Sequence, residues 1–372
     1  MQPGRTSSLV VYDFLAASGG AERLSLTVAR LLAADVFVGF RVAGAAASFD
    51  EAEGVRLRCV LRGTWRLGAW SCLLVFLRFL LPIDRSRRDV VFVSGVFAVG
   101  ALLWTRARKR IYYCHTPPKF CFEEFDAYFG GLGNWSRLLA RVGCAVFARV
   151  YAFCLRRADH VFSNSRYTQQ RLRTHVGIDS EVLYPPPASF AFEDAPAPKP
   201  SLSRADYLSL ARHEPAKRVD LVCQAFAEMP EQTLIVASSG SLTKDLETRY
   251  AQCPNIRFVG TLSDRALAER IRASRATIYI PQGEDFGMSV VESLALGTPV
   301  ITVREGGISE ILDDRMIEWL LPACPTVEQI KATVRSTPAS LGRLGDVAQA
   351  CRSVAARFHP GRFASALREI VS

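Results

Sequence analysis

Short apolar runs alternate with amphipathic stretches along the whole chain. In the first half, the runs SLVVYDFL, DVVFVSG and IYYC alternate with helical patterns near residues 21–32 and 98–108. In the second half, the runs YLSLA, TLIVAS, IRFVG and ATIYIP alternate with helical patterns that begin near residues 218, 243 and 264. This rhythm is typical of βαβ units that build a parallel sheet covered by helices. The pattern therefore predicts an α/β fold.

One segment interrupts this rhythm. Residues 184–203 are rich in proline and alanine and show no hydrophobic period, as expected of a linker between domains. With 372 residues, 49% of them hydrophobic, the chain is long enough for two cores. We predict two Rossmann-like domains, residues 1–187 and 188–357, and a closing helix over 358–372. Sheets of this kind bind ligands at the carboxyl ends of their strands, so we expect a cleft there.

The segment GEDFGMSVVESLALGTPVI, residues 283–301, places two carboxylates around the start of a predicted helix. Glu284 precedes a turn that ends at Gly287, and Glu292 lies one turn inside the helix that follows. The first turn of a helix offers unpaired amide donors and a partial positive charge, which suit hydroxyl and phosphate oxygens. The alternative is an ordinary βα unit with two surface glutamates.

Three further groups follow predicted strands or begin predicted helices. Arg212 and Lys217 follow the run YLSLA, where two cations would meet a diphosphate, although solvated basic residues are also common there. Gly19 and Gly20 open a helix and permit close approach of a ligand to the backbone. His115 ends the run IYYC before two prolines, and a lone histidine is often structural.

Together these segments resemble the donor site of the retaining glycosyltransferases of family 4. The resemblance rests on E-x7-E followed by ALGTPVI and Gly306-Gly307, on LARHEPAKR at 210–218 and on HTPPK at 115–119. It implies the GT-B fold, in which two Rossmann-like domains face each other across a cleft and a C-terminal helix crosses back to the first domain. Two departures are Lys119, where many relatives have arginine, and Ser238-Ser239, where relatives often have Gly-Asp.

The resemblance also assigns roles to the candidate residues. It implies that Arg212 and Lys217 bind the donor diphosphate, that Glu292 binds the nucleotide ribose and that His115 contacts the transferred sugar. Sugar hydroxyls would be held by Glu284 and by the amides of Phe286, Gly287 and Met288, while Gly19, Gly20 and Lys119 would border the donor phosphate and the acceptor. It places Asn164, Ser165 and Arg166 near the cleft, as supports or as ligand contacts.

The implied reaction is metal-independent transfer of a sugar from a nucleotide donor. Fixed cations and helix amides stabilise the charge that develops on the departing diphosphate, so we expect neither a metal nor a cofactor. The HTP loop and the EDFGM variant look most like mannosyltransferases of bacterial surface polysaccharide assembly. We therefore expect GDP-mannose as the donor, with UDP-sugars as the alternative, and a glycan or a lipid-diphosphate-linked acceptor.

The positive charge lies almost entirely in the first half of the chain. Residues 1–187 contain 25 Lys and Arg against 14 Asp and Glu, whereas the remainder contains 21 against 22. Segments 62–82 and 134–157 mix aromatic and arginine side chains, which suits either a helix in a lipid headgroup layer or a buried helix. The longest apolar run, residues 67–77, is too short to span a bilayer. We expect contact with an anionic membrane surface.

Composition limits the remaining possibilities. The N-terminal apolar run is short and interrupted by Asp13, so we expect a first strand and no secretion signal. Ten cysteines without a CxxC pair favour reduced thiols and argue against zinc. These features predict a cytoplasmic protein at the inner face of the membrane. Other classes considered are a nucleic-acid binder, for which no motif is present, a sugar-nucleotide epimerase, and a catalytically silent sugar-binding or scaffold protein.

Overall fold

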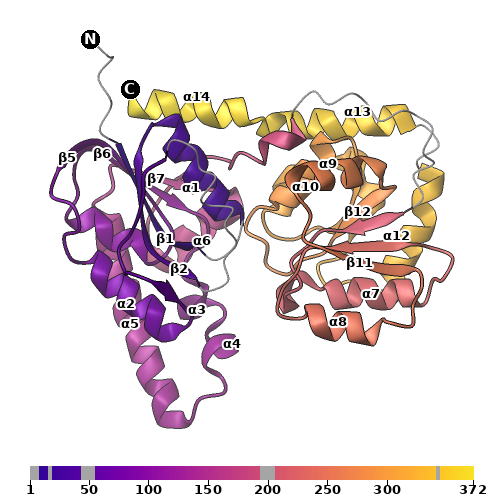
Figure 1. Ribbon diagram of the computed structural model, residues 1–372, viewed down its shortest axis with the longest axis horizontal. Helices are drawn as coiled ribbons and strands as arrows, with labels where there is room; N and C mark the ends of the chain where they lie inside the picture. The colour runs from indigo at the N-terminus through magenta and orange to yellow at the C-terminus, as the bar shows by residue number, and fades with distance from the viewer. Residues whose placement is uncertain (1–7, 16–18, 43–54, 193–205, 341–343) are drawn as a thin grey trace. The chain divides into compact units, whose positions relative to one another are not determined.

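The computed structural model describes residues 8–15, 19–42, 55–192, 206–340 and 344–372. The chain divides into two compact units: unit 1 comprises Met1–Tyr184 and Ala364–Ser372, and unit 2 comprises Pro185–Phe363. Each unit contains one parallel sheet with helices packed around it (Figure 1). The predicted fold class of two parallel-sheet α/β domains is therefore confirmed.

The sheet of unit 1 has the order β3-β2-β1-β5-β6-β7-β8, with β4 paired to β2. All of these pairs are parallel. The strands are β1 (Ser8–Leu15), β2 (Asp35–Val42), β3 (Leu57–Cys59), β4 (Thr64–Trp65), β5 (Arg87–Ser94), β6 (Arg106–Cys114), β7 (His160–Ser163) and β8 (Glu181–Val182). The helices are α1 (Gly20–Leu31), α2 (Ala69–Phe79), η2 (Ala98–Leu103), α3 (Lys119–Phe122), α4 (Phe125–Phe129), α5 (Asn134–Leu155) and α6 (Arg166–Val176).

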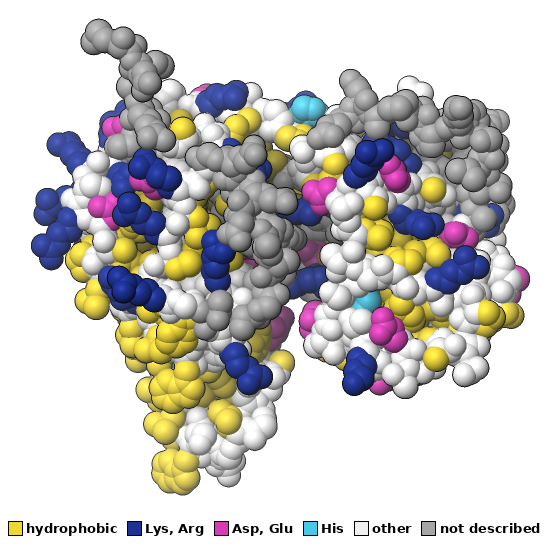
Figure 2. All heavy atoms as spheres, viewed as in Figure 1, with side chains coloured by type: hydrophobic (Ala, Val, Ile, Leu, Met, Phe, Trp, Pro, Cys, Tyr) yellow, Lys and Arg dark blue, Asp and Glu magenta, His cyan; other side chains and the backbone are white. Residues whose placement is uncertain are grey.

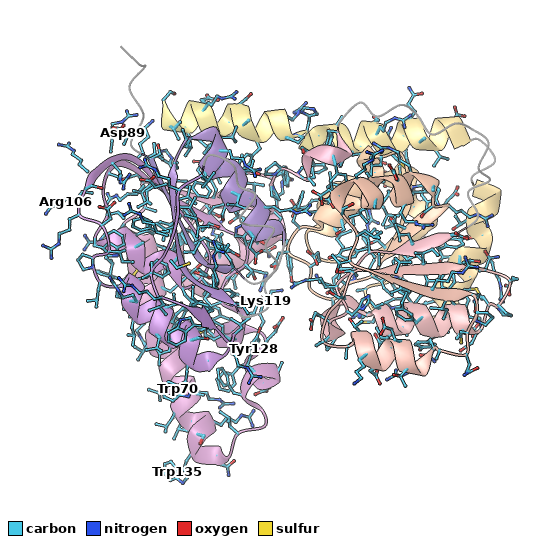
Figure 3. The ribbon with its side chains drawn as sticks, in the orientation of Figure 1. Trp70, Asp89, Arg106, Lys119, Tyr128 and Trp135 are labelled. Carbon is cyan, nitrogen blue, oxygen red and sulfur yellow. The ribbon has the colours of Figure 1, made fainter. Side chains whose placement is uncertain are left out.

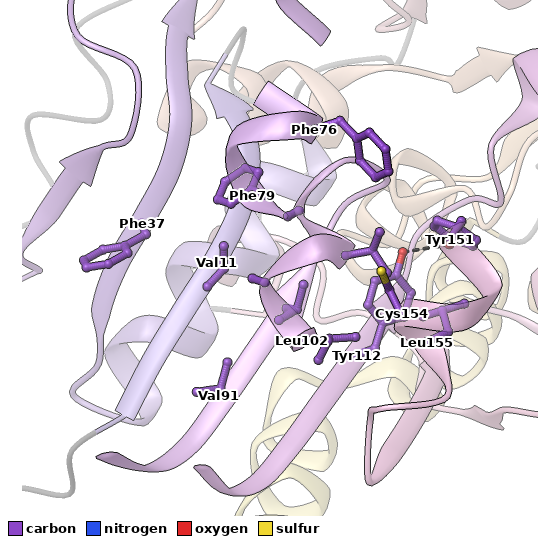
Figure 4. Close-up of a cluster of buried hydrophobic side chains, with 14 of the residues drawn as sticks. Val11, Phe37, Phe76, Phe79, Val91, Leu102, Tyr112, Tyr151, Cys154 and Leu155 are labelled. Carbon is purple, nitrogen blue, oxygen red and sulfur yellow. Dashed lines mark hydrogen bonds between the residues drawn. The ribbon is translucent and has the colours of Figure 1, made fainter. Parts of the chain in front are cut away.

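The core of unit 1 forms where α2, η2 and the end of α5 pack on one face of this sheet (Figure 4). Tyr112 of β6 and Tyr151 of α5 are fully buried, and their hydroxyls share a hydrogen bond of 2.8 Å. The Tyr112 hydroxyl also donates a hydrogen bond of 2.8 Å to the carbonyl of Gly95, so both buried hydroxyls have partners. The bond between the two tyrosines fixes the C-terminal half of α5 against the sheet.

The sheet of unit 2 has the order β11-β10-β9-β12-β13-β14, again with parallel pairs. Its strands are β9 (Tyr207–Ser209), β10 (Leu234–Ala237), β11 (Ile256–Gly260), β12 (Ala276–Tyr279), β13 (Val300–Val303) and β14 (Leu320–Leu321). Its helices are η3 (Ser189–Ala191), η4 (Pro215–Lys217), α7 (Val219–Ala227), α8 (Thr243–Arg249), α9 (Asp264–Ala273), α10 (Met288–Ala295), α11 (Ile308–Ile311), η5 (Asp314–Trp319), α12 (Val327–Ser340), α13 (Leu344–Ala355) and η7 (Ala356–Phe358).

The last helix, α14 (Pro360–Val371), begins in unit 2 and ends in unit 1. Lys109 donates a hydrogen bond of 2.7 Å to the carbonyl of Ile370, and Arg108 donates one of 2.9 Å to the carbonyl of Val371. The last carbonyls of a helix lack partners within the helix and carry partial negative charge, so cations stabilise them. The basic strand β6 thus holds the C-terminus of α14.

Two elements differ from the expected boundaries. The predicted helix over residues 98–108 ends at Leu103, because the charged sequence RARKR extends β6 back to Arg106. In the described part of the chain, one helix, α5, is long and apolar enough to cross a bilayer by length and composition, and 22% of its most apolar stretch is buried. The apolar run at residues 67–77 lies mostly in α2, which is shorter.

The predicted linker lies partly outside the described residues, since 193–203 fall in one of the gaps. All ten cysteines carry free thiols.

Candidate functional site

The sequence-predicted donor residues of unit 2 follow the carboxyl ends of two neighbouring strands. β9 and β12 pair in parallel, so both end at the same edge of the sheet. Arg212 follows β9, and the loop that carries Glu284 follows β12. This edge is where sheets of this type bind ligands.

Lys217, Tyr279 and Glu284 form a closed set of hydrogen bonds at this edge. The Lys217 ammonium lies 2.5 Å from Oε2 of Glu284 and 3.1 Å from the Tyr279 hydroxyl. The Tyr279 hydroxyl in turn donates to the same Glu284 oxygen at 2.8 Å. Lys217 and Glu284 keep about a fifth of their side-chain surface exposed, so both can reach a ligand. The structure thus brings together two of the residues that the sequence nominated.

Tyr279 is the buried member of this set. Burial raises the pKa of its hydroxyl well above the usual value, and the negative charge of Glu284 acts in the same direction. The hydroxyl therefore stays protonated and remains a hydrogen-bond donor at any physiological pH. Sequence reasoning missed this residue. The signal was a polar-tipped aromatic at the last position of a buried strand, just before the loop that carries Glu284.

A second loop braces the backbone around Glu284. The amide of Gly307 donates to the carbonyl of Glu284 at 2.9 Å, and Gly306 has a left-handed φ of +59°. A Cβ on Gly306 would come within 2.3 Å of that carbonyl oxygen, so the approach requires glycine. Glu305 accepts from the amide of Gly283 at 2.9 Å, and its Oε2 is buried without a partner among the described residues.

The helix that carries Glu292, α10, begins directly after the loop that carries Glu284. Gly287 is its N-cap and has a left-handed φ of +104°, which favours glycine, and the helix runs from Met288 to Ala295. Phe286 is buried. Glu292 is also buried, and its Oε1 accepts a hydrogen bond of 3.2 Å from the amide of Ala188.

In unit 1, His115 follows β6 and is held from two sides. Its Nε2 lies 2.7 Å from the hydroxyl of Ser94, the last residue of the neighbouring strand β5. Asn164 donates a hydrogen bond of 2.9 Å to the His115 carbonyl. Burial lowers the pKa of His115 to about 3, so the imidazole is neutral at physiological pH. It is suited to hydrogen bonding and not to donating a proton as an imidazolium.

The glycines of the first loop lie at the start of α1. Gly19 is the N-cap of this helix, and Gly20 is its first residue. A Cβ at Gly19 would lie 2.6 Å from a carboxylate oxygen of Glu22, so a larger residue there would require the end of the Glu22 side chain to shift. Lys119 begins α3 and forms an ion pair of 3.9 Å with Glu124.

Asp13, a buried carboxylate that the sequence analysis did not predict as a site residue, holds the backbone that follows β5. Asp13 accepts hydrogen bonds from the amides of Val96, Phe97 and Ala98, at 2.7, 2.8 and 2.5 Å. These amides lie at the start of η2, where a carboxylate satisfies donors that have no partner within the helix. Burial nevertheless raises the pKa of Asp13 to about 7.

The candidate residues therefore form two groups. Arg212, Lys217, Glu284, Glu292 and residues 286–288 lie in unit 2, while Gly19, Gly20, His115 and Lys119 lie in unit 1. Within the described ranges, no three His, Cys, Asp or Glu side chains gather in a way that would hold a metal ion.

Two family models match consecutive parts of the chain. Residues 18–186 match the model described as "Glycosyltransferase Family 4", and residues 193–337 match the one described as "Glycosyl transferases group 1". The two matches correspond to unit 1 and unit 2.

Sequence relatives match over most of the chain at low identity. The chain is 24% identical to human alpha-1,3/1,6-mannosyltransferase ALG2 over 404 residues, covering 95% of this chain and 93% of that protein. It is 24% identical to the Schizosaccharomyces pombe enzyme of the same name, covering 82% of this chain and 68% of that protein.

Solved structures agree in fold. Anabaena HepE, in a crystal structure with UDP and glucose, superposes with a TM-score of 0.71 at 16% identity, covering 97% of this chain and 98% of that one. Each unit of the chain has its own parallel sheet and its own family match. The chain is therefore an enzyme that belongs to glycosyltransferase family 4.

Proposed function

We propose that the protein transfers mannose from GDP-mannose, with retention of anomeric configuration, to a glycan or lipid-diphosphate-linked acceptor in surface polysaccharide synthesis. The observation that carries the proposal is the cluster of Lys217, Glu284 and Tyr279 at the ligand-binding edge of the unit 2 sheet. The names of the human and yeast relatives, both alpha-mannosyltransferases, support mannose as the transferred sugar.

The donor diphosphate would be bound by Arg212 and Lys217. Lys217 is at present paired with Glu284, and a diphosphate offers the ammonium stronger acceptors at the same edge. Glu284 would then accept hydrogen bonds from sugar hydroxyls, while it keeps the bond from Tyr279. Glu292, buried one turn into α10, would bind the ribose. This arrangement supplies both cations and carboxylates to a donor without a metal.

The reaction would proceed at the anomeric carbon of the sugar. The bond between this carbon and the diphosphate oxygen breaks, and the leaving GDP carries the electron pair. The acceptor hydroxyl forms the new bond on the face that GDP leaves, and its proton passes to an oxygen of the leaving phosphate. Arg212 and Lys217 stabilise the charge on that phosphate. His115, neutral because of its lowered pKa, would contribute a hydrogen bond to the sugar.

We further propose that the enzyme works in the cytoplasm, peripherally on the inner face of the membrane. The excess of basic residues in 1–187, 25 against 14 acidic, supports contact with anionic lipids. A lipid-diphosphate acceptor would be drawn to the same charge.

Hydrolysis and transfer assays with a panel of sugar nucleotides test this function. We expect turnover with GDP-mannose, and we expect Glu284→Ala to fold normally but to lose transfer by at least about a hundredfold, since a charged partner of the sugar is lost. Glu318→Ala, which removes an exposed carboxylate elsewhere in unit 2, is the matched control and should behave like the unmodified enzyme.

Three results would contradict the proposal in different ways. Turnover with a UDP-sugar but not with GDP-mannose would show that the donor is a UDP-sugar. Conversion of the donor to an epimer without an acceptor would show that the enzyme is an epimerase. Undiminished transfer by Glu284→Ala would show that Glu284 is not part of the donor site.

A further inference from the structure

Large apolar side chains with substantial exposure are concentrated in one part of unit 1. Among the described residues, those that stand out as exposed lie between Leu67 and Phe153, apart from Val259 and Ile317 of unit 2. Figure 2 shows the corresponding hydrophobic side chains gathered over α2 and α5. Scattered single side chains need no explanation, but a contiguous apolar surface usually marks a partner.

On α2, the exposed residues follow a helical period. Trp70, Leu73, Leu74 and Leu77 stand at positions i, i+3, i+4 and i+7, so they form one stripe along the helix. Trp70 is the most exposed of them, at 79%. The opposite face is also apolar, and it packs into the core of unit 1.

The same pattern recurs on α5. Trp135, Leu138, Leu139, Val142 and Val146 form a second stripe with helical spacing, and Trp135 is 81% exposed. Figure 3 shows Trp135 close to the end of α5 farthest from the unit 1 sheet. The other face of the C-terminal half packs into the core. Both helices are therefore apolar on the outer face as well as on the inner one, which an ordinary surface helix is not.

The two helices lie side by side. Both pack against η2, and the rings of Phe76 on α2 and Phe147 on α5 are in tilted contact, with centroids 4.7 Å apart. We call the two outward stripes together the α2–α5 ridge. Beside it, a pocket of about 410 Å³ opens between α5 and the short helices α3 and α4, with Phe122, Phe125 and Ala148 together with Asp126 and Arg141 in its wall. The surface next to the ridge is therefore partly apolar and partly charged.

The charges within the two segments that carry the ridge are all positive, and Asp126 on the neighbouring α4 pairs with one of them, Arg137. Residues 62–82 contain three arginines and no acidic residue, and residues 134–158 contain five arginines and no acidic residue. Apolar side chains with tryptophan at the edge and arginine around them suit the interface of an anionic bilayer. A second copy of the chain is disfavoured as occupant, because packing ridge on ridge would bring an excess of arginines together, of which Arg137 has Asp126 as a counter-charge.

We propose that the α2–α5 ridge inserts into one leaflet of an anionic lipid bilayer, with Trp70 and Trp135 in the interface and the arginines against the headgroups. The inference deepens the proposed membrane location. It rests on that proposal where it places the ridge on the same membrane as the acceptor. It specifies apolar insertion, whereas the charge excess alone would give only electrostatic adsorption. The helix α5 does not span the bilayer in this arrangement, because Tyr151 and Leu155 remain in the core of unit 1.

Vesicle binding of the purified protein tests the proposal. We expect co-sedimentation with phosphatidylcholine vesicles that contain phosphatidylglycerol, and we expect part of this binding to survive high salt. Trp70→Ser and Trp135→Ser should each weaken the partition coefficient about tenfold, because each removes a large interfacial anchor. Lipids with brominated chains should quench the fluorescence of Trp70 and Trp135, which the two variants identify.

Matched controls separate this surface from the enzyme's chemistry. Ile317→Ser removes an apolar side chain that is 59% exposed in unit 2 and should bind vesicles normally. The vesicle experiment uses neither donor nor acceptor, so it succeeds or fails independently of the proposed reaction. Transfer to a soluble acceptor should be unchanged in the tryptophan variants, and circular dichroism verifies their fold.

Four outcomes would overturn the proposal. These are an absence of vesicle binding, complete release by salt with no effect of the tryptophan variants, and an equal loss in Ile317→Ser. The fourth is resistance to extraction by alkaline carbonate, which would indicate that α5 spans the membrane. A dimer in solution that the tryptophan variants abolish, without vesicle binding, would assign the ridge to a second copy of the chain.

Discussion

The substitution Tyr279→Phe tests whether the hydroxyl of Tyr279 positions the donor site. It removes one oxygen and leaves the ring, so the contact of the Lys217 ammonium with the ring face, 5.5 Å from the centroid, is kept. Two hydrogen bonds are lost: the bond that Tyr279 donates to Glu284 at 2.8 Å and the bond that it accepts from Lys217 at 3.1 Å. Packing of the buried strand is otherwise unchanged.

The expected size of the effect follows from these two bonds. A hydrogen bond to a charged group contributes about 1.5–3 kcal/mol. The ion pair between Lys217 and Glu284, 2.5 Å long, does not involve the oxygen that the substitution removes, which favours the lower end of the range. If the lost interaction is needed in the transition state, the activation free energy for kcat/KM rises by about 2 kcal/mol, and kcat/KM falls roughly 30-fold. Because Tyr279 acts through Glu284, the loss should appear mainly in kcat.

The assay is steady-state transfer from GDP-mannose, with Tyr207→Phe as the matched control. Tyr207 lies on the adjacent strand β9, is fully buried and donates its hydroxyl to the carbonyl of Val334 at 2.8 Å. Its replacement should cost about 1 kcal/mol of stability and leave kcat/KM unchanged. In a Glu284→Ala background, Tyr279→Phe should have little further effect, because its partner is already absent. The reasoning fails if Tyr279→Phe stays within about twofold of the unmodified enzyme, or if Tyr207→Phe loses as much activity.

Two other predictions follow from single contacts. Gly306→Ala should lower the free energy of unfolding by about 2–4 kcal/mol in a denaturant titration, because its Cβ would lie 2.3 Å from the Glu284 carbonyl. Gly260→Ala, with a similar φ of +67° and open space around it, should lose only the smaller conformational part, and equal losses would exclude the clash as the cause. For His115, whose pKa falls from 6.5 to about 3 on burial, the unfolded chain binds more protons between these values, so stability decreases as pH falls through this window. His115→Asn should flatten this decrease, by at most about 5 kcal/mol in total, and an unchanged pH profile would contradict the neutral buried imidazole.

The sequence was most informative about features that depend on residues close together in the chain. The alternation of apolar runs predicted the parallel sheets, and the spacing of Glu284 and Glu292 around a glycine predicted the start of α10, since such features depend on neighbouring residues. The pairing of Lys217 with Glu284 joins residues far apart in the chain. The resemblance implied that both residues contact the donor, but their direct pairing was not predicted, because the apolar periods do not show which strands are neighbours.

Tyr279 and Asp13 show why the rest of the site was not predictable. Tyr279 contacts Lys217 because β12 lies beside β9 in the sheet, although two strands separate them in the chain. Asp13 reaches the amides of residues 96–98 because β1 lies beside β5. In both cases the sequence shows only a polar residue near the end of an apolar strand. Its contacts depend on which strand the crossover connection places beside it. The end of each buried strand is therefore where a sequence of this class should be searched for further site residues, since parallel strands bring these ends to one edge.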